Sequence, residues 1–263
     1  MINFNTIECS VADRLVELKF NRPNQGNAMS IEWARELAEA VNFIGTHPDV
    51  GAILLSGAGP QFSVGGDIGL FTTRVEEMPD VVQELTLYVH AAMARLLRLD
   101  APIVAAVQGV AAGGAVSMIA NCDLVIAGRS ASFHAAYSKI GLACDLGGTF
   151  GLASRMGLAR ARRFILLGES MDAGSAHSAG LVDELVDDAE LMSRARQVAD
   201  RLAAGPTRAY GEIRRLMARS FGQPFEAQIE DEAQAMFRTA STDDAREGIM
   251  AFAEKRKPRF TGR

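Results

Sequence analysis

A short apolar run, Ile103–Val107, is followed by three glycines, Gly109, Gly113 and Gly114, and then by a small, apolar segment that can be helical. A strand that passes through a glycine turn into a helix leaves backbone N–H groups at the helix start without partners. Because glycine carries no side chain, Gly113 and Gly114 leave those N–H groups open to a ligand. We therefore interpret one of them as a donor of an oxyanion hole. Tight packing of a helix on a sheet explains the same glycines, and this stretch alone favours packing.

Composition argues against several classes of protein. The chain has 263 residues and a net charge of −5, so we expect no nucleic-acid partner. Its three cysteines and four histidines have no spacing typical of a metal site. The stretch Pro102–Gly128 is apolar, but Gln108, Asn121 and Asp123 interrupt it, which favours a buried strand–helix–strand over a membrane span. With an odd number of cysteines and no signal-like N-terminal segment, we expect a cytoplasmic protein with free thiols.

Hydrophobic periodicity predicts an α/β fold around the glycine turn. Alternating apolar residues predict a hairpin over residues 4–20, and an apolar stripe predicts a helix that starts after Ser30. Further buried strands are expected near residues 52, 103 and 124, with helices between them, which gives repeated βαβ units. Residues 69–81 show no clear periodicity and are interpreted as a mobile surface segment before a helix over residues 82–99.

The C-terminal part has a different pattern. From about residue 150 it is mostly helical, apart from a strand-like stretch over Gly180–Val186, and Gly205-Pro206 precedes further helices. A composition shift near residue 200 divides the chain into a core, 1–200, and a C-terminal helical region, 201–263. A monomer would partly expose the apolar stripes of that region, so we expect an oligomer. The stripes contain Ile213, Leu216 and Met217, then Ala233, Met236 and Phe237.

Several separate stretches resemble the crotonase superfamily, also called the enoyl-CoA hydratase/isomerase family. They are Asn21-Arg22-Pro23 with Asn27-Ala28-Met29, Phe62-Ser63-Val64-Gly65-Gly66-Asp67-Ile68, Gly109-Val110-Ala111-Ala112-Gly113-Gly114-Ala115, Gly180-Leu181-Val182, and the ending from Arg246 to Arg256. Each motif alone is weak, whereas their order and spacing over almost the whole chain are specific. The resemblance implies a crotonase-like ββα spiral with a helical C-terminal region, assembled as a homotrimer or a homohexamer.

The resemblance also implies the ligand, which is an acyl-CoA thioester, and no cofactor beyond the coenzyme A of that substrate. At the positions that match the family, the backbone N–H groups of Gly66 and Gly114 would bind the thioester carbonyl oxygen. An enolate concentrates negative charge on that oxygen, and preorganised donors stabilise it. Other matching positions concern substrate binding. The positions that line the CoA pocket are Ala28, Val64, Asp67 and Ile68, and Val110 lies beside the glycine turn. Phe252 and Lys255 match a C-terminal tail that in the family often reaches the CoA of a neighbouring subunit.

Two positions depart from the hydratases of the family. Those enzymes carry two glutamates that hold and activate a water, and the matching positions here are Ser117 and Tyr137. Neither side chain can act as a carboxylate base, and hydration needs a positioned water with a base beside it. We therefore assign Ser117 and Tyr137 to the substrate pocket and do not expect efficient hydration.

Asp145 is the carboxylate that remains near the site. Residues 133–149 and the ending Pro258–Gly262 resemble the subgroup of 1,2-epoxyphenylacetyl-CoA isomerases and related enoyl-CoA isomerases. Those proteins also lack the two glutamates and use the aspartate, although they usually have a proline where this chain has Ala143-Cys144. The residues alone favour Asp145 as the cap of a helix from Leu146 onward. With the resemblance, Asp145 is expected to be the catalytic acid–base.

The expected function is an enzyme that stabilises a thioester enolate, with double-bond or ring-epoxide isomerisation favoured over hydration in fatty-acid oxidation. A dinucleotide-binding enzyme is disfavoured because the G-x-G-x-x-G spacing is absent. A serine hydrolase is disfavoured because no G-x-S-x-G surrounds Ser117. A non-catalytic acyl-CoA-binding protein stays open: the missing glutamates support it, and Asp145 with the intact glycines opposes it.

Overall fold

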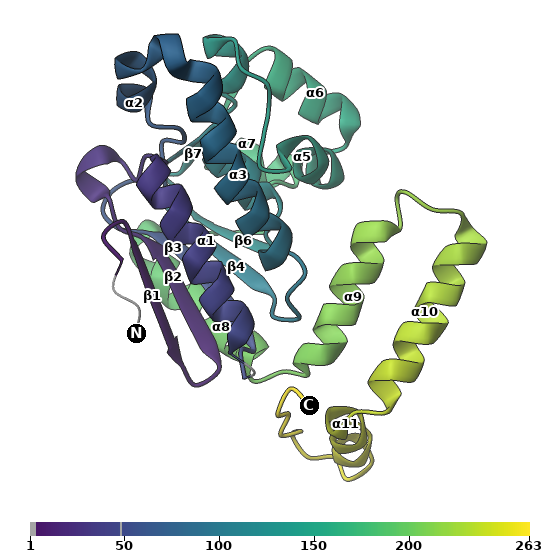
Figure 1. Cartoon of the computed structure of the whole chain (residues 1–263). Helices are drawn as coiled ribbons and strands as arrows, with labels where there is room; N and C mark the ends of the chain where they lie inside the picture. The colour runs from purple at the N-terminus through teal and green to yellow at the C-terminus, as the bar shows by residue number, and fades with distance from the viewer. Residues whose placement is uncertain (1–3, 48) are drawn as a thin grey trace.

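A six-stranded sheet forms the centre of the molecule in the order β1-β2-β3-β4-β6-β9, in a computed structural model that describes residues 4–47 and 49–263 (Figure 1). β1 and β2 pair antiparallel, and the other neighbours pair parallel. The strands are β1 (Ile7–Ala12), β2 (Leu15–Phe20), β3 (Ala52–Gly57), β4 (Ile103–Val107), β6 (Leu124–Gly128) and β9 (Glu184–Val186). The prediction of an α/β fold is confirmed.

Helices cover both faces of this sheet. α1 (Ile31–Thr46) and α3 (Met78–Leu96) lie on one face, and α8 (Leu191–Ala203) lies on the other (Figure 1). Successive residues of β3 alternate between the two sides: Ile53 belongs to the core under α1 and α3, and Leu54 to the core under α8. Both are buried, which explains why the strands were visible in the sequence as continuous apolar runs.

A second, three-stranded sheet carries the glycine turn to the edge of the core. It contains β5 (Val110–Ala112), β7 (Ser132–His134) and β8 (Ser170–Asp172). β5 pairs parallel with β7, and β7 pairs antiparallel with β8. The sequence interpretation missed β8 because three residues are too few for a periodic signal, and the strand forms by pairing with β7.

The predicted hairpin and helix cap are confirmed. Asp13 and Arg14 link β1 to β2 with φ values of 49° and 68°, the left-handed geometry of a tight two-residue hairpin turn. Ser30 precedes α1, and its hydroxyl accepts a hydrogen bond from the Trp33 N–H at 3.2 Å. Trp33 itself is fully buried and packs edge-on against Phe20.

Residues 69–81, predicted as a mobile surface segment without clear periodicity, are mostly exposed but helical. α2 (Ile68–Thr73) is followed by the 3₁₀ helix η2 (Val75–Glu77), and α3 then begins at Met78 and ends at Leu96. The Asp67 carboxylate accepts the Leu70 N–H at 3.2 Å and so caps α2. Local capping therefore fixes elements that are too short to show a helical period.

The remaining short helices surround the second sheet and the C-terminal part of the core. They are η1 (Pro23–Gln25), α4 (Gly114–Ala120), η3 (Tyr137–Ile140), α5 (Gly148–Met156), α6 (Leu158–Leu166), α7 (Ala173–Ala179) and η4 (Asp188–Glu190). Within the described residues, no helix has the length and apolar character needed to cross a membrane.

Three helices stand away from the core as a C-terminal arm (Figure 1). They are α9 (Thr207–Arg219), α10 (Phe225–Ala240) and α11 (Asp243–Ala253). The helix before them, α8, continues to Ala203, and the Gly205-Pro206 break lies between α8 and α9. The arm exposes large apolar side chains that the stripes of the sequence predicted. Ile213, Met217, Met236 and Phe237 are each more than half exposed.

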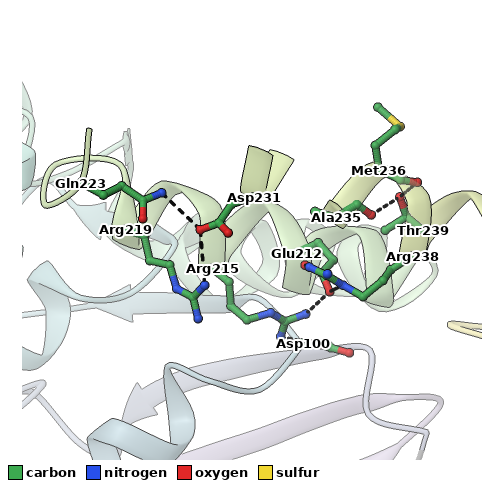
Figure 2. A network of polar contacts seen from close by, with 10 residues as sticks. All are labelled: Asp100, Glu212, Arg215, Arg219, Gln223, Asp231, Ala235, Met236, Arg238 and Thr239. Carbon is green, nitrogen blue, oxygen red and sulfur yellow. Dashed lines mark hydrogen bonds and ion pairs between the residues drawn. The ribbon is translucent and has the colours of Figure 1, made fainter. Parts of the chain in front are cut away.

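Ion pairs hold the arm together and tie it to the core. Figure 2 shows Glu212 of α9 beside Arg215 and Arg238, while Arg215 also pairs with Asp100 of the core at 2.6 Å. The Arg238 hydrogen bond and the nearby Arg215 lower the pKa of Glu212 from its usual range. A second ion pair joins Arg214 of α9 to Asp123 of the core at 2.7 Å. The Arg214 side chain is about one-tenth exposed and the Asp123 side chain about one-quarter exposed. The arm therefore has a fixed direction relative to the sheet.

The last residues of the chain fold back onto the start of α11. Asp244 is buried, and its carboxylate accepts the N–H groups of Thr261 at 2.7 Å and Gly262 at 2.8 Å. At the end of the tail, Arg263 pairs with Asp49 of the core at 2.8 Å. The tail thus links α11 to the core.

We predict that Asp244→Ala lowers the free energy of unfolding by about 2 kcal/mol, because two N–H groups lose a charged acceptor. Urea denaturation measures this loss. Asp243→Ala is the matched control, since the neighbouring Asp243 side chain is 77% exposed and should change stability little. Equal stability of the two variants would show that the tail contact does not hold the arm.

Candidate active site

The first half of the site is the loop that follows β3. Ser63 is fully buried, and its hydroxyl donates to Asn27 O at 2.8 Å and accepts the Gly65 N–H at 3.1 Å. Gly65 O in turn accepts the Met29 N–H at 2.8 Å. Among the described residues, no acceptor binds the next N–H, that of Gly66. Gly66 is only partly buried, so this donor is available to a ligand.

The second half is the turn from β5 into α4. Gly113 has φ 51°, and its N–H donates to His134 O at 2.9 Å. Gly114 opens the helix, and its N–H has no acceptor in the part of the chain that the structure describes. In both halves one glycine anchors the backbone and the next presents a free N–H group. The prediction that Gly66 and Gly114 supply the donors of an oxyanion hole came from the resemblance, and both N–H groups have the free position that this role requires.

The two halves touch each other. Ser63 and Ala111 form an isolated parallel bridge, and Ala112 N donates to Ser63 O at 3.0 Å. A Cβ atom on Gly65 would lie 2.5 Å from Ala112 O and 3.5 Å from Gly114 N. No side chain fits at Gly65, because a Cβ there would clash with Ala112 O at the end of β5. The loop that carries Gly66 therefore packs directly against the segment that leads into Gly114.

A strained turn brings Asp145 to the same place. Leu146 and Gly147 have φ values of 52° and 71°, and the left-handed region costs a residue such as Leu roughly 1–2 kcal/mol. Leu146 is buried, and its Cδ1 would lie 2.9 Å from a Cβ on Gly114, while Asp145 Oδ1 would lie 3.8 Å from the same atom. The Asp145 carboxylate thus lies beside the Cα of Gly114.

The Tyr137 hydroxyl donates a short hydrogen bond to Asp145 Oδ1 and lies 2.8 Å from Ser117 Oγ. Burial, and then the neighbouring Asp145 carboxylate, raise the pKa of the Tyr137 phenol far above its usual range. Tyr137 therefore stays protonated and acts as a donor. Asp145 Oδ2 has no hydrogen bond from the described residues, so it is the oxygen left for a ligand.

Asp145 does not cap a helix. α5 begins at Gly148, its N-cap is Gly147, and no side chain caps it. The helix-cap interpretation of Asp145 is thus wrong, because the left-handed Leu146 and Gly147 separate the carboxylate from the helix start. The first residue of α5, Gly148, must lack a side chain, because a Cβ there would lie 2.1 Å from Ser117 Oγ.

Cys144 completes the polar wall beside Asp145. Its sulfur lies 3.5 Å from Ser117 Oγ. Burial raises the pKa of the Cys144 thiol, so the group stays neutral. Ser117, Tyr137 and Cys144 together place hydroxyls and a thiol, and no second carboxylate, next to Asp145.

The substrate residues expected from the sequence are only partly brought together. Val64 is exposed in the loop that carries Gly66, and Ile68 is exposed at the start of α2. Ala28 is buried, and Val110 opens β5. Asp67 caps α2 and pairs with Arg22 at 3.1 Å, so it has a local structural role as well. Phe252 and Lys255 belong to the end of the arm, and the single chain holds α11 at the opposite end of the molecule from α2 (Figure 1).

Two residues that the sequence interpretation missed hold the turn after Asp145. Asn121 ends α4, and its side-chain NH₂ donates to Ser117 O at 2.8 Å, Gly147 O at 3.1 Å and Leu146 O at 3.2 Å. His90 of α3 accepts the Leu146 N–H at Nε2, 3.2 Å away. No sequence signal indicated either residue, since the contacts span 25 and 56 positions.

A hollow of about 810 Å³ lies far from this turn, between α11 and the C-terminal tail. Charged residues line it, among them Arg256 and Glu247, which form an ion pair at 2.6 Å. That pair and the Arg259 N–H lower the pKa of Glu247 to about 2. None of its lining residues belongs to the Gly66 loop, the Gly114 turn or the Asp145 turn, so this hollow is a separate feature of the arm. Among residues 4–47 and 49–263, no group of His, Cys, Asp and Glu is arranged to hold a metal ion.

Comparisons of the sequence and of the structure with known proteins agree on one protein family. The profile of the family described as enoyl-CoA hydratase/isomerase matches residues 11–263. The chain is 34% identical over 250 residues to 1,2-epoxyphenylacetyl-CoA isomerase of Escherichia coli K12, covering 95% of both chains. It is 32% identical over 262 residues, 100% of both chains, to a protein of Rhodobacter capsulatus named probable enoyl-CoA hydratase. The crystal structure of an enoyl-CoA hydratase from Polaromonas superposes with a TM-score of 0.90 at 28% identity, covering 97% of this chain and 99% of the other.

We predict that Tyr137→Phe lowers the free energy of unfolding by about 1.5–3 kcal/mol, because the buried ring keeps its packing while Asp145 loses its donor. Urea denaturation at neutral pH measures the change. Tyr210→Phe is the control, since the Tyr210 hydroxyl has no hydrogen bond to the described residues. If the two variants were equally stable, the Tyr137–Asp145 contact would not contribute to the site.

Proposed function

The chain belongs to the enoyl-CoA hydratase/isomerase family, and from that premise we propose that it isomerises an enoyl-CoA by moving a proton along an enolate. The observation that carries this proposal is the Asp145 carboxylate, which lies beside Gly114, the residue whose N–H has no acceptor among the described residues. The relatives bear the names of both isomerases and hydratases, so the family alone does not select the reaction. The choice of isomerisation rests on the residues around Asp145.

In the proposed reaction, the thioester carbonyl oxygen of a 3-enoyl-CoA accepts hydrogen bonds from Gly66 and Gly114. Asp145 Oδ2 removes a proton from C2, and the electron pair of that C–H bond moves onto the carbonyl oxygen to give a dienolate. The two N–H groups stabilise this charge, and each donor of this kind is typically worth about 10²–10³ in rate. Asp145 then returns the proton at C4, which leaves a conjugated 2-enoyl-CoA.

The same geometry disfavours hydration. A hydratase needs a base that activates water and an acid that protonates the α-carbon. Ser117 and Tyr137 are hydrogen-bonded to each other, and the raised pKa of the Tyr137 phenol keeps it from acting as a base. Because the proposed step only moves a proton, it requires no cofactor beyond the coenzyme A of the substrate.

The arm supports a further part of the proposal, assembly into a homotrimer or homohexamer. Its exposed apolar side chains need a cover, and Phe252 is 86% exposed at the end of α11. A neighbouring copy would bury these surfaces and bring Phe252 and Lys255 to the CoA of the adjacent site. In each subunit, Ala28, Val64, Asp67 and Ile68 would then line the CoA-binding side.

We predict that the parent protein converts 3-enoyl-CoA to the conjugated thioester and that Asp145→Asn lowers this rate by roughly 10²–10⁴. Asn keeps an acceptor for Tyr137, so the fold and CoA binding should persist. The assay follows the absorbance of the conjugated thioester, and Asp243→Asn at an exposed position is the control.

The same assay, started from 2-enoyl-CoA, tests the competing reaction. Rapid loss of the conjugated absorbance, with kcat well above ~10 s⁻¹, would identify a hydratase and contradict the proposal. An Asp145→Asn variant as active as the parent would contradict the assigned role. If neither thioester reacts, an epoxide-bearing phenylacetyl-CoA is the next substrate, and no turnover there would favour a non-catalytic acyl-CoA-binding protein.

Sedimentation tests the assembly. At micromolar concentration we predict a species of three or six chains, each of 28.1 kDa. A clean monomer would mean that the apolar face of the arm is not covered by another copy.

A further inference from the structure

The turn that carries Asp145 is in a conformation that its sequence does not favour. Leu146 has a φ of 52°, although a leucine there clashes with its own backbone. Such a residue persists only where its surroundings hold it. The Asn121 side chain binds the carbonyl groups of Leu146 and Gly147, which fixes one side of the turn. The N–H of Leu146 is on the other side.

His90 binds that N–H. Its Nε2 lies 3.2 Å from Leu146 N, whereas the described residues offer no other hydrogen bond to the ring. To accept the bond, Nε2 must carry a lone pair, so the bond requires the tautomer with the proton on Nδ1. His90 belongs to α3, an element distant in sequence from the turn, and the bond joins the two.

We propose that His90 is a positioning residue for Asp145: by accepting the Leu146 N–H, it holds the left-handed turn and so aims the neighbouring carboxylate at the acyl chain. This role rests on the proposed function, because it matters only if Asp145 moves a proton. The bond binds the peptide group that directly follows Asp145. Its loss would let that peptide rotate, and a displacement of about 1 Å at a reacting group can cost roughly 10²-fold in rate.

Two substitutions at His90 distinguish a requirement for the hydrogen-bond acceptor from a requirement for the imidazole ring. His90→Gln places an amide oxygen near the position of Nε2 and keeps an acceptor. His90→Leu introduces an apolar side chain and removes the acceptor. Gln83→Leu is the matched control, because Gln83 is exposed two helical turns earlier on the same side of α3.

Two measurements on the full-length protein test the proposal. With 3-enoyl-CoA as substrate, we expect His90→Leu to lower kcat by roughly 10–10²-fold with little change in KM. The Asp145 carboxylate would no longer be held in position, whereas CoA binding would be kept. We expect His90→Gln and Gln83→Leu to stay within a few-fold of the parent. In hydrogen exchange of the peptide over residues 143–148, we expect the Leu146 amide to exchange about tenfold faster in His90→Leu alone.

A His90→Leu variant with parental kcat and parental protection of Leu146 would overturn the proposal. So would a His90→Gln variant as impaired as His90→Leu, since the ring and not its acceptor atom would then be required. Hydrogen exchange needs no substrate. If the parent isomerises no enoyl-CoA, the proposed function fails, and the exchange result alone still decides whether His90 holds the turn.

Discussion

The carboxamide of Asn121 joins α4, the helix that begins at Gly114, to the turn that carries Asp145. Asn121 ends the helix whose first residue is Gly114, and it binds the carbonyl groups of Leu146 and Gly147. The helix that begins at Gly114 and the turn that carries Asp145 are therefore tied to one another through this side chain. A reaction that develops charge on one atom and moves a proton at another requires such a fixed relation.

The rest of the fold holds the Gly114 turn, the Gly66 loop and the Asp145 turn in place. The parallel strands, buried on both faces, place the β5–α4 turn, and the buried Ser63 hydroxyl holds the loop of Gly66 against it. Because the donors are backbone groups, they cannot be removed by mutation of a side chain, and the chemistry is left to vary with the few side chains around them. Here those are Ser117, Tyr137 and Cys144, which surround one carboxylate with neutral polar groups.

Sequence reasoning identified what depends on local pattern and missed what depends on distant contacts. The apolar runs, the glycine turn and the Ser30 cap each carry a signal within a few residues, and all were predicted. Asp145 was found through a resemblance, since Asp-Leu-Gly-Gly alone is typical of a helix cap. Its true geometry requires a left-handed Leu146, which no propensity favours and which Asn121 and His90 impose from 25 and 56 residues away. The short α2 was missed because one capping contact, not a period, defines it.

The central claim is that the free N–H groups of Gly66 and Gly114 and the Asp145 carboxylate act on the same thioester. A crystal structure with an unreactive saturated acyl-CoA tests it most directly. The claim predicts that the thioester oxygen lies about 2.7–3.1 Å from both N atoms. It also predicts that Asp145 Oδ2 faces the acyl carbons next to the thioester, while Oδ1 keeps its bond to Tyr137. A thioester bound with its oxygen elsewhere, or with its acyl carbons turned away from Asp145, would contradict it.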